Sequence, residues 1–167
     1  DDPGGTVRTG IPPHRLPREV VDADLARVRA HGVELRCGEA PDVQALADGH
    51  DALLVASGLG RPMRLRIPGE ELPGVWSARA ILASLARGQD GLLSGRVIVI
   101  GGGNTSMDAA TAALALGADE VTLVYRRSEA QMPAWPRERE LARRLGVVIR
   151  PLVGPVAIEG DGKVEAL

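Results

Sequence analysis

The sequence predicts an α/β fold of Rossmann type with a central parallel sheet, and two stretches carry this prediction. In the first, RVIVIGGGNTSMD at residues 96–108, an unbroken β-branched run gives way to three glycines and then to a helical pattern. Such a run is typical of a strand buried on both faces of a parallel sheet. The second stretch, VTLVY at residues 121–125, is the next buried strand. Together they have the length of one βαβ unit.

The three glycines fit a loop that holds a dinucleotide. Gly101, Gly103 and Ser106 fall at the positions of the Gly-x-Gly-x-x-Gly/Ala pattern. The first glycine permits a tight turn, the second lets the backbone approach a pyrophosphate, and the third position must be small so that the helix packs on the strand. The amides at the start of the helix would then face the phosphate.

The residues after the second strand predict which nucleotide binds. An acid at this corner would accept hydrogen bonds from the ribose hydroxyls of NAD, but this chain has Arg126 and Arg127 there. Two guanidiniums suit a 2′-phosphate, so the pair favours NADP(H) over NAD(H). The alternative is an ordinary solvated corner with two exposed arginines.

The first part of the chain predicts a second, less regular αβ region. Residues 1–16 are rich in glycine and proline and predict a loop. A helix is expected from Pro17 to a stop at Gly32. Short strands are expected at residues 33–36 and 51–56, as in another αβ unit of an α/β protein.

The remaining elements follow from cap residues and apolar spacing. Serine favours the start of a helix, and glycine favours its end. The expected elements are a helix capped by Ser77 and ending at Gly88, a helix ending at Gly117, a helix at about 136–145, a strand at 147–150 and a hairpin at 156–167.

Composition excludes several classes of function. The 20 basic and 22 acidic residues nearly balance, so a nucleic-acid surface is not expected. Cys37 is the only cysteine, which excludes an internal disulfide, a Cys-x-x-Cys redox pair and a cysteine-ligated iron–sulfur cluster within these residues. The three histidines lack metal-ligand spacing. Since no apolar run approaches the roughly 20 residues of a membrane span and no signal peptide pattern is present, the expected compartment is the cytoplasm.

Asp108 follows the glycine loop within the expected helix. A catalytic carboxylate is one interpretation. The simpler one is an acid that caps free amides at the helix start and is favoured there by the helix dipole. The sequence favours the cap, and no side chain is assigned a catalytic role.

The order of several motifs resembles the glutamate synthase small subunit group. That group includes the flavin and NADPH half of dihydropyrimidine dehydrogenase and belongs to the flavoproteins of the pyridine nucleotide-disulfide oxidoreductase type, which have two dinucleotide-binding domains. The resemblance covers nearly the whole chain. The motifs that carry it are GGTVRTGIPPHRLPREVV, DALLVASG, IPGEELPGVWSA, VIVIGGGNTSMDAA, VTLVYRRSEAQMPA and GDGKVEAL.

The resemblance implies an oxidoreductase that passes hydride from NADPH to FAD and electrons onward to an iron–sulfur or other acceptor in a partner domain or subunit. It implies that residues 1–76 are a partial FAD-binding segment. Residues 77–167 would be the NADP(H)-binding domain with the start of the segment that returns to the FAD domain. Because the first FAD glycine loop is missing from these residues, this chain alone is expected to be inactive.

The resemblance also implies roles for individual residues. Gly102, Gly103, Asn104 and Thr105 would surround the NADPH pyrophosphate, with the two arginines on the 2′-phosphate. Ser106 departs from the usual Ala, so its hydroxyl needs a partner such as a carbonyl one turn back. The residues expected to line FAD in the complete enzyme are Gly10, Ile11, Arg15, Leu16, Ala56, Ser57 and Gly58. Two alternatives stay open: a noncatalytic NADP(H)-binding or partner-docking module, and a scaffold whose glycine loop binds nothing.

Overall fold

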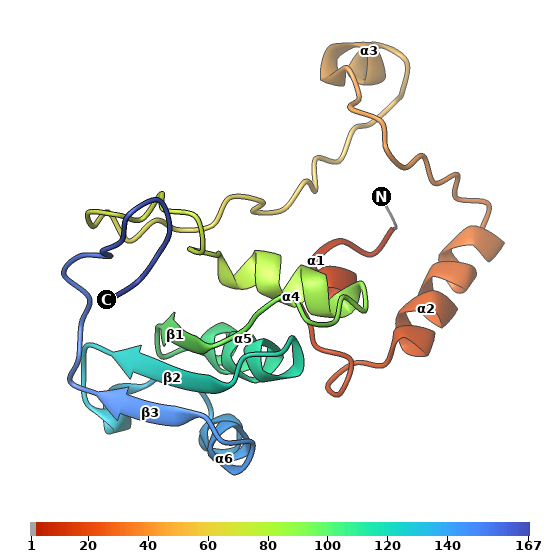
Figure 1. Cartoon of the computed structure of the whole chain (residues 1–167). Helices are drawn as coiled ribbons and strands as arrows, with labels where there is room; N and C mark the ends of the chain where they lie inside the picture. Colours follow the sequence, from red (N-terminus) through yellow and green to blue (C-terminus); the bar gives the residue numbers. More distant parts are fainter. Residues whose placement is uncertain (1–2) are drawn as a thin grey trace.

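A three-stranded parallel sheet forms the centre of the computed structural model, which describes residues 3–167 (Figure 1). The strands β1 (Arg96–Ile100), β2 (Glu120–Tyr125) and β3 (Val148–Pro151) lie in the order β1-β2-β3. In register, Val97 pairs with Val121, and Leu123 pairs with Ile149. The predicted parallel sheet is therefore confirmed.

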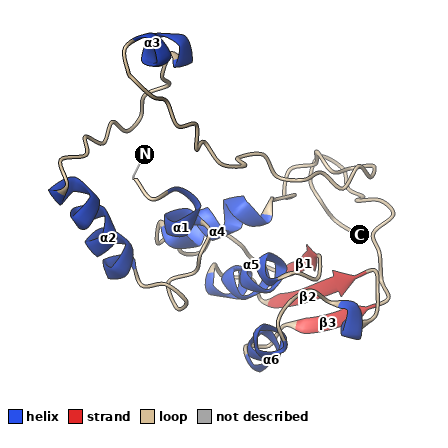
Figure 2. Cartoon of the chain, turned by 180° about the vertical axis from the view of Figure 1, so that it is seen from behind, coloured by secondary structure: helices blue, strands red, loops and turns tan. Residues whose placement is uncertain are grey.

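Two crossover helices cover one face of this sheet. Helix α5 (Asn104–Ala115) connects β1 to β2, and α6 (Pro136–Arg144) connects β2 to β3. Figure 2 shows both helices on the same side of the sheet, and α5 packs against β1, β2 and α6. The buried face of α5 consists mostly of alanines, so the helix lies close to the sheet. The core between these layers is formed by Met107, Ala110, Ala113, Ala118, Val121, Leu123, Met132, Ala134, Ala142 and Val147.

Helix α4 (Ala78–Ala86) packs against α5. Its N-terminus is capped as predicted, because the Ser77 hydroxyl accepts a hydrogen bond from Ala80 N at 3.2 Å. A second small core lies between α4 and α5 and contains Ile81, Leu82, Ala112 and Leu116.

Residues before α4 form short helices joined by long irregular segments (Figure 1). Helix α2 (Arg18–Ala30) follows Pro17 as predicted. The loop predicted for residues 1–16 is partly wrong, because α1 (Gly5–Thr9) is helical, while residues 1 and 2 lie outside the described part. Helix α3 (Val43–Asp48) was not expected. It begins at Asp42, whose carboxylate accepts hydrogen bonds from Gln44 N and Ala45 N.

The strands predicted at residues 33–36 and 51–56 do not form. The second segment stays extended and exposed, with 89% of the Leu54 surface accessible. An isolated β-strand leaves its backbone donors and acceptors without partners, so an apolar run needs neighbouring strands to become one. The predicted hairpin at 156–167 is likewise reduced to a single antiparallel bridge between Glu159 and Ala166.

A helix that crosses a bilayer needs roughly 20 consecutive, predominantly apolar residues. Within residues 3–167, no helix is both long enough and apolar enough to cross a membrane.

Candidate functional site: the glycine loop and its neighbours

The glycine loop leaves β1 at its carboxyl end and turns directly into α5. Gly101 has φ 143°, a conformation that glycine adopts far more readily than other residues, and its N–H donates to Val124 O on β2 at 3.0 Å. A Cβ added at Gly101 would come within 2.3 Å of the Ser106 hydroxyl. The tight turn predicted for the first glycine is confirmed, and the small residue at Ser106 lies against it.

The second and third glycines have different surroundings. A Cβ at Gly102 would lie 2.5 Å from the ring of Tyr125, so this glycine is required by packing. A Cβ at Gly103 would meet no atom within 4 Å, and Gly103 has φ −91°, which other residues also adopt. The surface over Gly103 is therefore open, and neither the fold nor the backbone conformation requires a glycine there.

Backbone amides converge beside this open surface. Gly103 is the N-cap of α5, and its carbonyl accepts hydrogen bonds from Ser106 N and Met107 N at 3.0 and 3.2 Å. The amides of Asn104 and Thr105 belong to the first helical turn, where N–H groups have no partner within the helix. Such a helix start attracts an anion through these donors and the helix dipole.

A loop between β2 and α6 is fastened to the glycine loop. Ala134 N donates to Gly102 O, and Trp135 N donates to the Asn104 side-chain oxygen, both at 3.0 Å. Tyr125 donates its hydroxyl proton to Gln131 O at 3.0 Å. The Asn104 side chain thus supports the loop geometry, while its backbone amide stays at the helix start.

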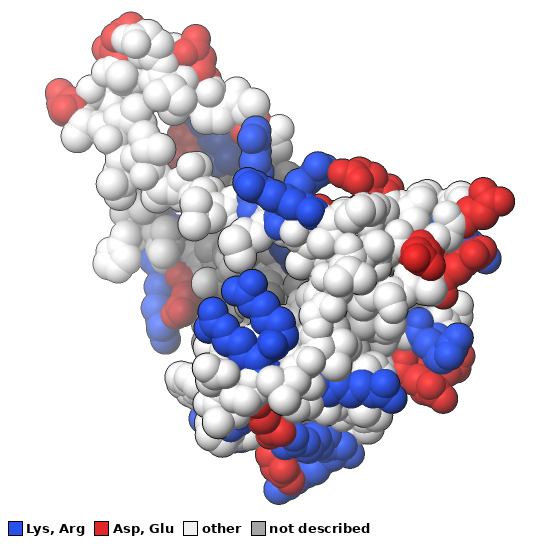
Figure 3. Space-filling view, turned by 90° about the vertical axis from the view of Figure 1, so that its left-hand side faces the viewer, with Lys and Arg blue, Asp and Glu red and all other residues white. Residues whose placement is uncertain are grey.

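The arginine pair lies at the end of β2. Arg126 and Arg127 are exposed and directly follow Tyr125. The turn after β3 holds the backbone at this corner, because Leu152 N donates to Arg127 O and Val153 N donates to Tyr125 O, both at 3.0 Å. Figure 3 views the side toward which β2 and β3 point in Figure 1, and basic side chains gather near the middle of this face.

A charged cluster joins the N-terminal segment to the two crossover helices. One terminal guanidinium nitrogen of Arg15 lies 2.9 Å from an Asp108 carboxylate oxygen and 2.5 Å from a Glu138 oxygen. Both acids are buried. Burial raises the pKa of Asp108 above its usual value of 3.8, and the Arg15 charge opposes this rise. Glu138 and His14 act on Asp108 more weakly, in opposite directions.

The cluster corrects the cap predicted for Asp108. Asp108 lies in the second turn of α5, and no side chain caps this helix among the described residues. The carboxylate instead pairs with Arg15, which arrives from a segment more than ninety residues earlier in the chain. A local rule for helix starts cannot detect a partner at such a distance.

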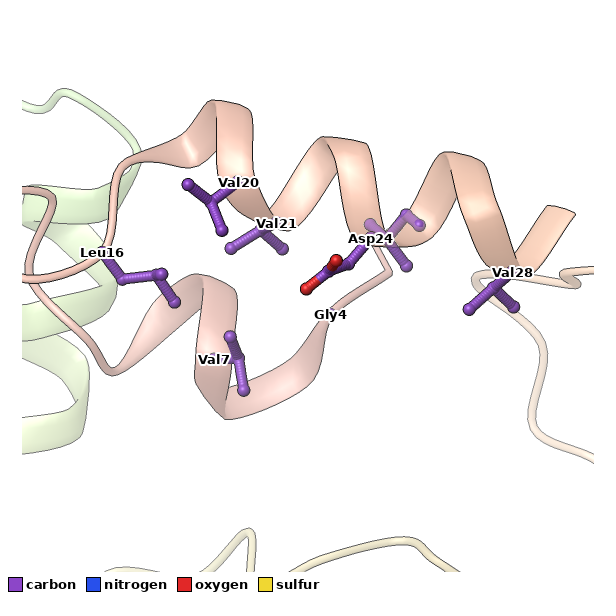
Figure 4. A pocket seen from close by; sticks show the side chains of 8 residues that line it. Gly4, Val7, Leu16, Val20, Val21, Asp24 and Val28 are labelled. Carbon is purple, nitrogen blue, oxygen red and sulfur yellow. The ribbon is translucent and has the colours of Figure 1, made fainter. Parts of the chain in front are cut away.

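The residues expected to line FAD do not form one site. Gly10 and Ile11 are half-buried, and Arg15 is committed to the charged cluster. Leu16 lines an apolar groove between α1 and α2 together with Val7, Val20 and Val21 (Figure 4). Ala56, Ser57 and Gly58 lie in the exposed irregular segment before α4. The roles of these residues toward FAD stay predictions.

Among residues 3–167, no group of three or more His, Cys, Asp or Glu side chains is arranged to hold a metal ion.

The family follows from a match over most of the sequence. Residues 14–167 match the family described as pyridine nucleotide-disulphide oxidoreductase. The chain belongs to this family. The expected α/β class and the resemblance to the glutamate synthase small subunit group are thereby confirmed.

Several curated proteins are similar over nearly the whole chain. The beta subunit of an NADP(+)-dependent formate dehydrogenase from Moorella thermoacetica is 37% identical over 95% of this chain and 23% of its own length. A putative NADPH glutamate synthase small chain from Cereibacter sphaeroides is 36% identical over 100% of this chain and 44% of its own length. PreT, a subunit of NAD-dependent dihydropyrimidine dehydrogenase from Escherichia coli K12, is 36% identical over 95% and 39%. The chain thus spans less than half of each relative.

The fold is shared with a solved oxidoreductase. FprA from Mycobacterium tuberculosis, in a structure with NADPH, superposes with a TM-score of 0.74 over 98% of this chain and 53% of that protein. The sequence identity is 23%, so this likeness concerns the fold.

Sequence reasoning missed two residues that shape the site. Tyr125 packs its ring on Gly102, and Glu138 completes the cluster around Arg15. Tyr125 had a usable signal, since it is the single tyrosine of a chain without phenylalanine and stands at the end of a buried strand. Glu138 had no usable signal, because it lies in a helix rich in charged residues, where an acid is expected at the surface.

Proposed function

We propose that this chain is the NADPH-binding part of a flavin-dependent oxidoreductase. In the whole enzyme, hydride would pass from NADPH to FAD and electrons onward to an iron–sulfur centre or another acceptor in a partner domain or subunit. The open surface over Gly103 carries the proposal, because it lies at the N-cap of α5 directly after the central strand β1. A pyrophosphate needs such close access to backbone.

Each part of the loop has a definite task in this proposal. Gly101 makes the turn, Gly102 admits the Tyr125 ring, and Gly103 leaves space for the pyrophosphate. Thr105 and Ser106 belong to the first turn of α5, beside the amides that would face the phosphate. The bound nucleotide supplies the hydride, and the protein residues orient it and neutralise its charge.

The adenosine end decides between NADP(H) and NAD(H). The names of the relatives include both nucleotides, so the preference of this chain has to follow from its own residues. Arg126 and Arg127 at the end of β2 favour a 2′-phosphate, since guanidiniums offer it charge-assisted hydrogen bonds. We therefore assign NADP(H).

The division of the chain follows the same proposal. Residues 77–167 would hold the nucleotide and begin the segment that returns to the FAD domain. Residues 1–76 would belong to the FAD-binding domain, with Ile11, Arg15, Leu16 and 56–58 toward the flavin once the rest of that domain is in place. We keep the cytoplasm as the expected compartment.

Titration calorimetry with NADPH and NADH tests the nucleotide assignment. We expect NADPH to bind about tenfold more tightly, which corresponds to about 1.4 kcal/mol. The double variant Arg126→Ala/Arg127→Ala should lose this preference and keep its affinity for NADH. Equal affinities in the unaltered chain, or a preference for NADH, would refute the role of the arginine pair.

A second candidate function is a noncatalytic NADP(H)-binding or partner-docking module. One observation favours it: the residues expected at FAD do not converge in the described structure, and Arg15 is bound to Asp108 and Glu138. The gene segments that flank this chain separate the candidates, because an FAD-binding glycine loop encoded upstream supports the oxidoreductase and its absence supports the module. An absorption spectrum of the purified chain tests a third case, since stoichiometric flavin with NADPH oxidation would make the chain itself an enzyme.

A further inference from the structure

Arg150 on β3 lies next to the arginine pair that follows β2. In the parallel register Arg150 pairs with Val124, which is two residues before Arg126. Adjacent strands lie about 4.8 Å apart, and residues two apart along a strand point to the same face. Arg126 directly follows the last residue of β2, so Arg150 and Arg126 lie at the carboxyl ends of adjacent strands, although 24 positions separate them in sequence.

The turn after β3 holds this arrangement in place. Leu152 has φ 61°, a strained conformation for a bulky residue, and 75% of its surface is exposed. In this conformation, Leu152 N and Val153 N donate to Arg127 O and Tyr125 O. The backbone then passes Arg126 so closely that a Cβ on Gly154 would lie 3.5 Å from the Arg126 Cβ. The turn therefore fixes the arginine pair beside β3.

The three guanidiniums have no acidic partner within the described residues. Ion pairs in the neighbouring helix and loop engage other arginines, namely Arg137, Arg143 and Arg144. Arg126, Arg127 and Arg150 take part in no ion pair or side-chain hydrogen bond with residues 3–167. Cations at one edge of a sheet repel each other, and a bound anion reduces this repulsion.

We propose that Arg150 is a third arginine of the subsite for the 2′-phosphate of NADP(H), contributed by β3. This inference rests on the proposed function and extends it, because it makes the subsite a product of two strands and the strained turn at Leu152. A phosphate monoester carries between one and two negative charges near neutral pH. It therefore gains from a third cation even after the first two are engaged.

The expected contribution is modest because Arg150 is exposed. Charges in water interact weakly at contact distance, and salt screens them further. We expect Arg150→Ala to weaken binding of adenosine 2′,5′-bisphosphate about fivefold, or about 1 kcal/mol. Binding of adenosine 5′-monophosphate should stay unchanged, since it lacks the group that Arg150 contacts. Arg150→Lys should recover part of the loss by restoring the charge.

Titration calorimetry of the full chain with these two nucleotides tests the proposal. Arg96→Ala is the matched control, because Arg96 is also an exposed strand arginine but lies at the amino end of β1. We expect the control to bind both nucleotides like the unaltered chain. The loss in Arg150→Ala should shrink when salt is raised, as a charge interaction requires.

Two results would overturn the inference, and they differ from failure of the proposed function. If Arg150→Ala binds the bisphosphate as tightly as the unaltered chain, or loses affinity for both nucleotides equally, Arg150 does not read the 2′-phosphate. If the unaltered chain binds the two nucleotides equally or binds neither, the proposed NADP(H)-binding function itself is wrong.

Discussion

Two regions of this chain contain similar apolar strand patterns but only one of them folds into a sheet. Residues 96–151 hold all three strands, with the core side chains of β2 almost fully buried. Residues 31–76 contain DALLVA at 51–56, yet Leu54 and Val55 are among the most exposed large apolar residues that the structure describes. Figure 2 shows the contrast, because residues 51–56 belong to the stretch between α3 and α4 that is drawn as loop.

The difference between the regions is the presence of neighbours. Val97 on β1 pairs with Val121 on β2, and α5 covers the same residues. No strand of the described structure lies beside residues 51–56, so their backbone remains open to water. An apolar run therefore becomes a strand only where partners satisfy its hydrogen bonds and cover its side chains.

The largest expected effect compares one leucine from each region. Leu123→Ala removes a side chain with no exposed surface and should lower the free energy of unfolding by about 2 to 5 kcal/mol. Leu54→Ala should change it by less than about 0.5 kcal/mol, because 89% of that residue is exposed. Urea unfolding measures both. Equal losses would mean that residues 51–56 are packed in solution.

The charged cluster links the N-terminal segment to the sheet region. Arg15→Met leaves Asp108 without a cation and Glu138 with Arg137 alone, and should cost about 3 kcal/mol of stability. The triple variant Arg15→Met/Asp108→Asn/Glu138→Gln removes all three charges and should recover most of this loss. If Arg15→Met alone unfolds like the unaltered chain, the cluster does not contribute to stability.

The loss of stability caused by Arg15→Met should depend on pH. Burial raises the pKa of Asp108, so the native state holds its proton more tightly than the unfolded chain. The stability from this group is therefore complete below the unfolded pKa and falls as the pH rises toward the folded pKa. Without Arg15 the pKa rises further, with Glu138 still adding to the rise and His14 opposing it. The cost of Arg15→Met should then be larger near pH 7 than near pH 4.

Substitutions at two adjacent glycines of the sheet region should affect nucleotide binding and folding separately. Gly103→Val should keep the melting temperature, because the added side chain enters open space, and should weaken NADPH binding about 100-fold, or about 2.7 kcal/mol. Gly102→Ala should lower stability by about 1 to 3 kcal/mol, since its Cβ would clash with Tyr125. Thermal unfolding and calorimetry distinguish the two. A Gly103→Val chain with unchanged affinity would place the nucleotide elsewhere.

The smallest expected effect concerns helix caps in the two regions. Ser77→Ala removes the cap of α4, which packs on α5, and should cost about 1 kcal/mol in global unfolding. Asp42→Ala removes a comparable cap from α3, which has no buried residue, so only local unfolding should change. Hydrogen exchange of the α3 amides detects that local loss. A global change in Asp42→Ala would contradict the independence of α3.

Elements whose formation depends on nearby residues were predicted correctly. The strands of the sheet, the start of α2 after Pro17 and the cap at Ser77 depend on nearby residues, and all were expected. Within the site, the turn at Gly101 followed from the glycine spacing, and so did the helix start at Gly103. The cofactor roles of the loop and the arginine pair stay predictions.

The βαβ core and the glycine turn could be predicted because short-range patterns of burial, capping and backbone freedom specify them. Features that depend on residues far apart in the chain emerged only from the folded structure. It joined Arg15 to Asp108 and Glu138, packed Tyr125 on Gly102, and set Arg150 beside Val124. It also left residues 51–56 outside any sheet. Each of these results depends on which partners meet in space, and the pattern of a single segment does not contain that information.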